Sequence, residues 1–271
     1  MHHDPRYLAT AIDIVLRAGD IQMRHFGRPF DVVMKGSIDL VTEVDLEVER
    51  MCRAVLAERF PDHAILAEEL GGQPDAAAGT SEYCWLFDPI DGTTNYAHGF
   101  PVFCASLALE IRGRVEVGAI YDPTRRELFT VERGVGAFLN GTRLAVSKAD
   151  RLLEAVLVTG FPYDIHQHPD QVLGLFGAFI RQARAIRRLG SAALDLCYVA
   201  AGRLDGFWEG SLKPWDVAAG ALLVEEAGGR VTLMDGSPFA PRAGQIVAAN
   251  PGLLQPMLDV IAAFRQQPDS R

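Results

Sequence analysis

Three features are missing from this sequence, and each absence argues against a class of protein. None of the four cysteines belongs to a C-x-x-C pair, and each lies among apolar residues: Cys52, Cys84, Cys104 and Cys197. We therefore expect buried free thiols in a reducing compartment. No apolar stretch approaches the roughly 20 residues that span a bilayer. No basic region followed by an apolar run opens the chain, so we expect no secretory signal peptide and a cytoplasmic protein.

Positive charge is also in short supply. The formal net charge is −9, so we expect no direct binding of nucleic acid and no membrane partner. The 271 residues are 49% hydrophobic, which is enough for one large domain or two halves with a shared interface. Near 149–152 the pattern changes from sheet-rich to alternating strands and helices. We therefore predict a half of residues 1–150 and a half of residues 151–271 within one compact unit.

The stretch WLFDPIDGTTNYAHG, residues 85–99, carries the densest set of chemically useful side chains. The apolar residues 85–87 predict the end of a buried strand, which Pro89 should stop because it cannot donate a backbone hydrogen bond. Gly92 permits a backbone conformation that other residues resist. Thr93 and Thr94 are candidate N-caps of a following helix.

Asp88 and Asp91 would occupy the tight turn between that strand and that helix. Two such carboxylates repel each other unless a cation lies between them, and oxygen ligands suit Mg²⁺. The free amides of a helix start attract anions, so a phosphate-ester site is consistent with the pattern. An Asp-Gly-Thr turn is often only a turn, however, and the stretch alone leaves both interpretations open.

Three further acids lie where strands end or helices begin. Asp45 follows Thr42 by three residues, which predicts a capping box at the start of a helix that runs to about residue 60. Glu68 ends an apolar run, where paired acids commonly face solvent. Asp216 opens a helix and could combine capping with ligation. Sequence spacing does not establish that these acids converge on one two-ion site.

Hydrophobic periodicity predicts the remaining elements. We expect further helices over 5–26, 172–185, 193–201, 217–227 and 253–264. Strands are expected over 30–34, 64–67, 102–110, 115–121, 127–132, 136–139, 155–159, 205–209, 230–234 and 245–249. The middle of the chain predicts antiparallel sheet, with Asn140-Gly141 as a hairpin turn. The loop pair His166 and His168 is interpreted as surface.

Long motifs in this order resemble one known family. They are DLVTEVD, AEE, WLFDPIDGTTNYAHGFP and KPWDVAAGALLVEEAGG, and GSAALDLCYVAAGRLDGFWE is similar to bacterial members. On these motifs the chain resembles the inositol monophosphatase family of Mg²⁺-dependent, lithium-sensitive phosphatases, from the first helix to IVAANP. The resemblance implies an α+β or α/β fold, a layered αβαβα sandwich with the metal site between the halves, and a homodimer.

The resemblance also implies roles for individual residues. One Mg²⁺ would be held by Glu68, Asp88 and the carbonyl of Ile90, and a second by Asp88, Asp91 and Asp216, with two or three ions in all and Mn²⁺ as an alternative. Glu68 and Thr93 would activate the attacking water, and Asp45 would support Thr93. Substrate contacts would come from Asp91, Gly92, Thr93, Arg187, Ala192, Glu209 and Asp216. Lys35 matches a basic residue near the metal site.

The implied reaction is hydrolysis of inositol monophosphates, such as myo-inositol 1-phosphate, by metal-activated water and without a phosphoenzyme. Ala67, Leu70 and Lys213-Pro214 depart from the family pattern near the substrate mouth. Histidinol phosphatase, fructose-1,6-bisphosphatase and 3′(2′),5′-bisphosphate nucleotidase therefore stay open as alternatives to a small phosphorylated polyol. The similarity of residues 187–209 to bacterial relatives that bind transcription machinery adds another alternative, an interaction protein that contacts RNA polymerase or transcription factors.

Overall fold

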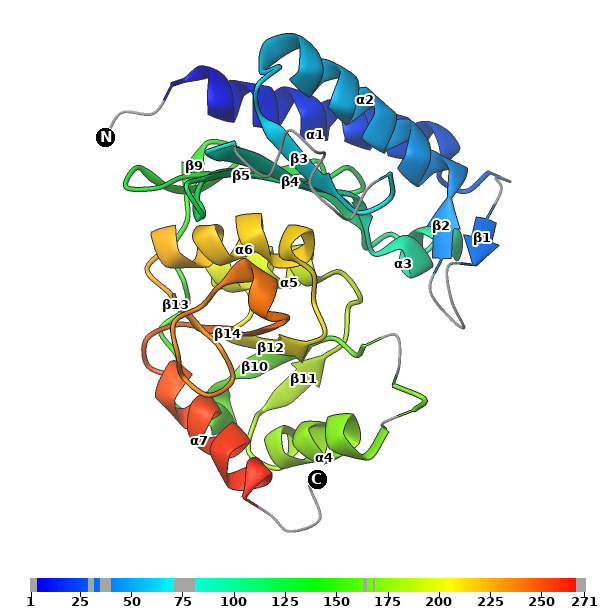
Figure 1. Ribbon diagram of the computed structural model, residues 1–271. Helices are drawn as coiled ribbons and strands as arrows, with labels where there is room; N and C mark the ends of the chain where they lie inside the picture. Colours follow the sequence, from blue (N-terminus) through cyan, green and yellow to red (C-terminus); the bar gives the residue numbers. More distant parts are fainter. Residues whose placement is uncertain are drawn as a thin grey trace.

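Helices and sheets alternate through the molecule as stacked layers (Figure 1). The computed structural model describes residues 4–28, 32–34, 40–70, 81–162, 165–167 and 169–266, so Lys35 and His168 lie outside the described residues. The outer helices α1 (Arg6–His25) and α2 (Glu43–Arg59) cover one face of a seven-stranded sheet. This arrangement follows from a stripe of buried residues on α1, among them Ala11, Ile14 and Ala18.

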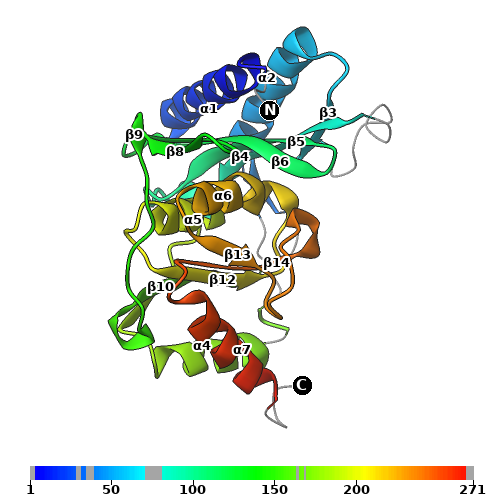
Figure 2. The same cartoon turned by 90° about the vertical axis from the view of Figure 1, so that its left-hand side faces the viewer.

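Two central helices separate this sheet from a second one. They are α5 (Ala192–Ala200) and α6 (Pro214–Glu226), and the far face of the five-stranded sheet carries α4 (Pro169–Ile180) and α7 (Leu254–Arg265) (Figure 2). The layers therefore follow the order αβαβα, which confirms the predicted layered α/β fold. One cluster of buried apolar residues extends from Leu66 and Leu86 of the first sheet through α5 and α6 to Ala248 of the second.

The seven-stranded sheet follows chain order from β3 to β9, with β3 parallel to β4 and every later neighbour antiparallel. Its strands are β3 (Ala64–Ala67), β4 (Tyr83–Asp91), β5 (Cys104–Ile111), β6 (Arg114–Asp122), β7 (Glu127–Glu132), β8 (Gly136–Leu139) and β9 (Thr142–Arg143). Asn140 and Gly141 both have positive φ and connect β8 to β9, as the hairpin signal predicts.

The five-stranded sheet has the order β11-β10-β12-β14-β13. Its strands are β10 (Val156–Thr159), β11 (Ala185–Arg187), β12 (Gly206–Gly210), β13 (Arg230–Thr232) and β14 (Gln245–Ala249). Because β10 and β12 are parallel, with Thr159 opposite Trp208, the residues that follow them lie side by side. The remaining elements are β1 (Val32–Met34), β2 (Leu40–Thr42), α3 (Thr93–Ala97) and two short 3₁₀ turns.

Three local predictions are wrong. Strand β4 does not stop at Pro89 but continues to Asp91, because its register against β5 shifts between Asp88 and Asp91 and spares Pro89 from the hydrogen-bond ladder. The N-cap of α3 is Gly92, in a left-handed conformation, rather than a threonine. Helix α4 ends at Ile180, since Ala185–Arg187 pairs with β10 as a short strand that periodicity did not separate from the helix.

The four cysteines are unpaired; Cys52, Cys104 and Cys197 are buried and Cys84 is half-buried. Within the described ranges, no helix combines the length and the apolar character needed to cross a bilayer.

Candidate active site

A cavity of about 570 Å³ lies where the two halves of the sequence meet. Its wall includes four carboxylates from three separate stretches of the sequence, Glu68, Asp88 with Asp91, and Asp216. Glu68 follows β3, the next two belong to the end of β4, and Asp216 lies in the first turn of α6. Parallel pairing of β3 and β4 carries the ends of both strands to one edge of the sheet.

The irregular end of β4 determines how its two aspartates are placed. Asp88 is 3% exposed, and its Oδ1 accepts a hydrogen bond from the Ile90 amide at 3.0 Å. The Ile90 carbonyl accepts from Thr93 Oγ1 at 2.9 Å. Gly92 closes the turn with a φ of 96°, and a Cβ there would lie 2.9 Å from the Val102 carbonyl. Only glycine meets both constraints without strain.

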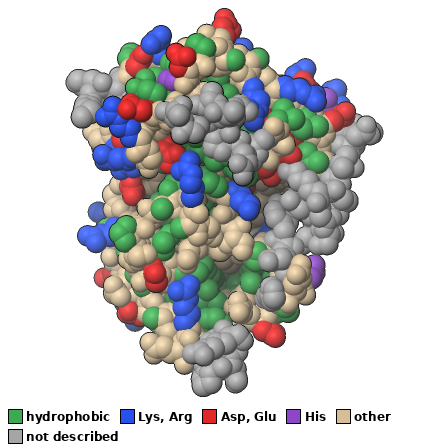
Figure 3. Space-filling view, viewed as in Figure 1, with side chains coloured by type: hydrophobic (Ala, Val, Ile, Leu, Met, Phe, Trp, Pro, Cys, Tyr) green, Lys and Arg blue, Asp and Glu red, His purple; other side chains and the backbone are tan. Residues whose placement is uncertain are grey.

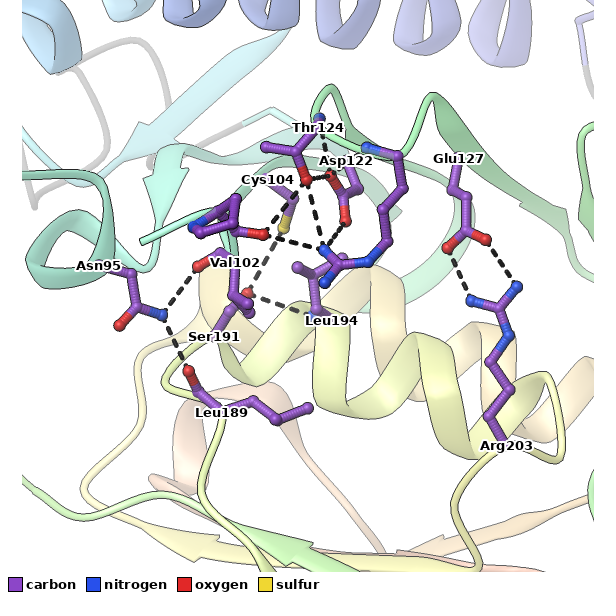
Figure 4. A network of polar contacts seen from close by, with 12 residues as sticks. Asn95, Val102, Cys104, Asp122, Thr124, Glu127, Leu189, Ser191, Leu194 and Arg203 are labelled. Atoms are coloured by element: carbon purple, nitrogen blue, oxygen red, sulfur yellow. Dashed lines mark hydrogen bonds and ion pairs between the residues drawn. The ribbon is translucent and has the colours of Figure 1, made fainter. Parts of the chain in front are cut away.

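Asp91 joins the first half of the chain to the loop before α5. Its Oδ2 accepts hydrogen bonds from Ser191 Oγ at 2.6 Å and from the Ala193 amide at 2.7 Å. Asn95 makes a second connection, since its Nδ2 donates to the carbonyls of Val102 and Leu189 at 2.8 Å each (Figure 4). These contacts fix the start of α5 against the end of β4.

Asp216 and Asp45 each complete a helix cap. Asp216 Oδ2 accepts from the Lys213 amide at 2.8 Å. Asp45 is fully buried, and its Oδ2 accepts from the amide and hydroxyl of Thr42 at 2.8 and 2.6 Å, which confirms the predicted capping box. Asp45 is not part of the cavity wall, but its charge raises the pKa of Asp88.

The cavity acids oppose one another electrostatically. Burial raises the pKa of Asp88 well above its usual range, and repulsion by Glu68, Asp91 and Asp216 adds to the effect. Burial, followed by the charge of Asp91, raises the pKa of Asp216 in the same way. Burial also raises the pKa of Asp91, although its hydrogen bonds with Ser191 and Ala193 act in the opposite direction. Keeping these carboxylates ionised and close together therefore costs electrostatic free energy, which a bound cation would lower.

This set of donors suits a hard divalent cation. All the side chains concerned offer oxygen, and the four acids line one cavity from the end of β3, the end of β4 and the start of α6. The described side chains do not already form a group of three or more His, Cys, Asp or Glu around one ion position. Two causes account for this spacing. Asp88, Asp91 and Asp216 each accept a hydrogen bond from a protein donor. Their carboxylates also repel one another unless a cation lies between them.

The cavity wall also includes Gly160, Arg188, Ala192, Asp195 and Glu209, which all come from the second half of the chain. Burial raises the pKa of Glu209 to about 8, and the nearby Arg188 guanidinium partly opposes this shift. The Glu209 carboxylate occupies the space beside Gly160, where a Cβ would lie 2.1 Å from it. Arg187, the arginine expected at the substrate, is exposed and is not among the cavity residues, whereas Arg188 is.

A second hollow of about 340 Å³ shares Gly160, Phe161 and Glu209 with the first cavity. Its walls come largely from β12, α4 and α7, and apolar side chains are visible on the molecular surface between those two helices (Figure 3).

The structure brings most of the predicted site residues to one cavity: Glu68, Asp88, Ile90, Asp91, Gly92, Thr93, Ala192, Glu209 and Asp216. Sequence reasoning missed the contributions of Ser191, Asn95, Gly160 and Asp195. Ser191 had a readable signal, since a serine before an apolar helix predicts an N-cap, and its Oγ does accept from the Leu194 amide. Gly160 and Asp195 had no local signal because their neighbours come from distant elements.

Comparisons with known proteins agree with this geometry. The family model described as "Inositol monophosphatase family" matches residues 4–268. The chain is 45% identical over 259 residues to the Nus factor SuhB of Pseudomonas aeruginosa, across 94% of this chain and 95% of that protein. It is similar to the solved inositol monophosphatase of Anabaena, with a TM-score of 0.85 and 40% identity over 97% of this chain and 96% of the other.

A more distant solved structure is an IMPase/NADP phosphatase complexed with Mg²⁺ and phosphate, with a TM-score of 0.78 and 26% identity. The aligned region covers 90% of this chain and 91% of the chain in that structure. The motifs, the layered fold and the match to nearly the whole chain lead to one conclusion. This chain belongs to the inositol monophosphatase family.

Proposed function

We propose that this protein is a Mg²⁺-dependent phosphomonoesterase that hydrolyses inositol monophosphates, such as myo-inositol 1-phosphate, to inositol and phosphate. The observation that carries the proposal is the cavity in which Glu68, Asp88, Asp91 and Asp216 meet from three separate places in the sequence. Membership of the family and the resemblance to a structure with Mg²⁺ and phosphate support the same reaction. The choice of inositol monophosphates among small phosphorylated polyols is also part of this proposal.

Each residue group has a distinct part in the proposed reaction. Glu68, Asp88, Asp91, Asp216 and the Ile90 carbonyl would hold the Mg²⁺ ions, two or three in number. Bound Mg²⁺ would neutralise phosphoryl oxygens and lower the pKa of a bound water. Glu68 and the Thr93 hydroxyl would orient the attacking water and accept its proton, with Asp45 as support for Thr93. The Gly92 and Thr93 amides would meet the phosphate.

The alcohol part of the substrate would lie beside Ala192 and Glu209, at what we call the alcohol end of the cavity. There Ala192 and Glu209 would meet its hydroxyl groups, and Asp91, a metal ligand in the same proposal, would contact one as well. Phosphate monoesters hydrolyse very slowly without a catalyst. The site must therefore align the phosphate with the attacking water and stabilise the negative charge of the transition state.

Phosphate release from myo-inositol 1-phosphate, with and without Mg²⁺, tests the proposal. We expect Mg²⁺-dependent release that Asp91→Asn lowers by more than about 100-fold, because the variant loses a charged oxygen and disturbs the contacts with Ser191 and Ala193. Asp259→Asn, the same chemical change at an exposed position, is the matched control and should keep full activity. Release that is unaffected by EDTA, or by Asp91→Asn, would contradict the proposal. Turnover of histidinol phosphate or fructose 1,6-bisphosphate far above that of myo-inositol 1-phosphate would reassign the substrate.

A second candidate function is an interaction with the transcription machinery. The observation in its favour is the 45% identity to a protein named Nus factor SuhB. Binding of the purified protein to purified RNA polymerase, followed by sedimentation, tests it. Asp91→Asn should bind as well as the wild type if this function is separate from catalysis, and lack of binding by both would remove the candidate. The same sedimentation experiment measures the homodimer that the family resemblance implies.

A further inference from the structure

Asp195 is a buried acid in the cavity wall to which the proposed reaction gives no part. It lies on α5 and is fully buried. Among the described residues, neither of its carboxyl oxygens has a hydrogen-bond partner. Buried polar atoms are nearly always paired, and an unpaired carboxyl lowers the stability of the fold. A side chain kept in this state needs a reason that folding alone does not supply.

The position of Asp195 relates it to the alcohol end of the cavity. It lies three residues after Ala192, so the two residues share one face of α5. The charges of Glu209 and Asp91 act on it, as does that of Arg188. Glu209 reaches the same place from the end of β12, in the space that Gly160 leaves open. Two acids from different layers thus approach the same part of the cavity.

Asp88, Asp91 and Asp216 each accept a hydrogen bond from a donor in the described part of the chain, and Asp195 does not. Asp91 is held by Ser191 and Ala193, and Asp216 by the Lys213 amide. A turn of the Asp195 carboxyl toward a ligand breaks no hydrogen bond of the protein. Because the residue belongs to the cavity wall, a carboxyl that turns in this way would meet a group that fills the cavity, and burial strengthens the hydrogen bond between them.

We propose that Asp195 is a specificity-determining residue, whose unpaired carboxyl hydrogen-bonds a hydroxyl of the substrate's alcohol beside the hydroxyl that Glu209 holds. The inference rests on the proposed phosphomonoesterase function and narrows its substrate class to alcohols with at least two hydroxyl groups besides the esterified one. A monoester without such hydroxyls gains nothing from Asp195. Its hydrolysis depends only on the end of the cavity that holds the phosphate.

Two substrates and two variants test this assignment. Wild type, Asp195→Asn and Asp195→Leu are compared on myo-inositol 1-phosphate and on p-nitrophenyl phosphate, whose leaving group has no further hydroxyl. We expect Asp195→Leu to lower kcat/KM for the inositol ester by about 10- to 100-fold, mainly through KM, with less than about a 2-fold change for p-nitrophenyl phosphate. Asp195→Asn, which keeps hydrogen-bonding atoms, should recover part of the loss. Gly160→Ala, which displaces the Glu209 carboxylate, should give the same selective loss.

A purely structural role predicts a different pattern. Both substrates would then be affected equally, and both Asp195 variants would have a lower Tm, whereas we expect the Tm of Asp195→Leu to be unchanged or higher because an unpaired buried carboxyl is removed. Equal loss on both substrates, or no loss on either, overturns the assignment. If the wild type releases phosphate from neither substrate, the proposed function itself fails, and this inference fails with it.

Discussion

Glu209 connects the chemistry of a single residue to the stability of the protein. Burial raises its pKa to about 8 from an ordinary value of 4.5. The folded state therefore holds the proton more tightly than the unfolded state. The stability that this proton provides is fully present below pH 4.5 and is lost as the pH rises through about 8.

We therefore expect Glu209→Gln to reduce the loss of stability between pH 5 and pH 8 in metal-free buffer by a few kcal/mol. Urea unfolding of the wild type and the variant at both pH values measures the difference. Glu58→Gln, an exposed change of the same kind, should leave the wild-type profile unaltered. The other buried acids contribute in the same direction to both proteins, so only the difference between the profiles reports Glu209. Parallel profiles for the wild type and Glu209→Gln would contradict the expectation.

At the scale of single residues, the sequence predicted acids well and their partners poorly. Asp88, Asp91 and Asp216 stand out because each follows an apolar strand or opens a helix. The hydrogen bond between Asp91 and Ser191 spans 100 positions, and no local pattern indicates it. Arg187 and Arg188 show the same limit, since Arg187 ends β11 and only Arg188, the residue after it, belongs to the cavity wall.

At the scale of elements, the start of α2 shows how one cap orients a helix near the site. Thr42 Oγ1 accepts hydrogen bonds from the amides of Val44 and Asp45 at 3.2 and 3.3 Å. The Asp45 carboxylate in turn accepts one from the Thr42 amide. We expect Thr42→Ala to lower the free energy of unfolding by about 1–2 kcal/mol. Thr42→Ser, which keeps the hydroxyl, should lose much less. Equal urea midpoints for the alanine and serine variants would show that the hydroxyl does not stabilise the helix.

Elements with their own local signals were predictable, and elements that depend on neighbours were not. The capping box of α2 and the Asn140-Gly141 hairpin depend on residues close in sequence, and both are confirmed. The continuation of β4 past Pro89 depends on β5, which changes register there. Strand β11 exists because β10 lies beside it, and its three residues are too few to show a period of their own.

At the scale of the whole molecule, the candidate site exists because two sheets are stacked on a shared pair of helices. The ends of β3 and β4, the first turns of α5 and α6 and the end of β12 meet at one cavity. Periodicity predicts each of these elements but not which sheet edge each one joins, so the family resemblance, not spacing, carried the expectation that the acids converge. The same stacking bears on how the chain unfolds.

We expect the two sheets to lose their structure together. One buried cluster extends from the first sheet to the second and includes Leu86, Leu196, Leu223 and Ala248. Exposing either face of α5 or α6 to water would therefore cost a large amount of free energy. Trp85 lies in the seven-stranded sheet and Trp208 in the five-stranded one, and both are buried.

Two variants with a single tryptophan each can report the two sheets separately. Trp208→Phe with Trp215→Phe leaves Trp85, and Trp85→Phe with Trp215→Phe leaves Trp208, because the chain has only three tryptophans. Within each variant, tryptophan fluorescence and far-ultraviolet circular dichroism should give the same urea midpoint, since one cooperative transition moves every probe together. Comparison within a variant removes the effect of the substitutions on stability. A fluorescence midpoint for Trp208 well below the circular dichroism midpoint would mean that the five-stranded sheet unfolds first, and that the cavity between the halves opens before the fold is lost.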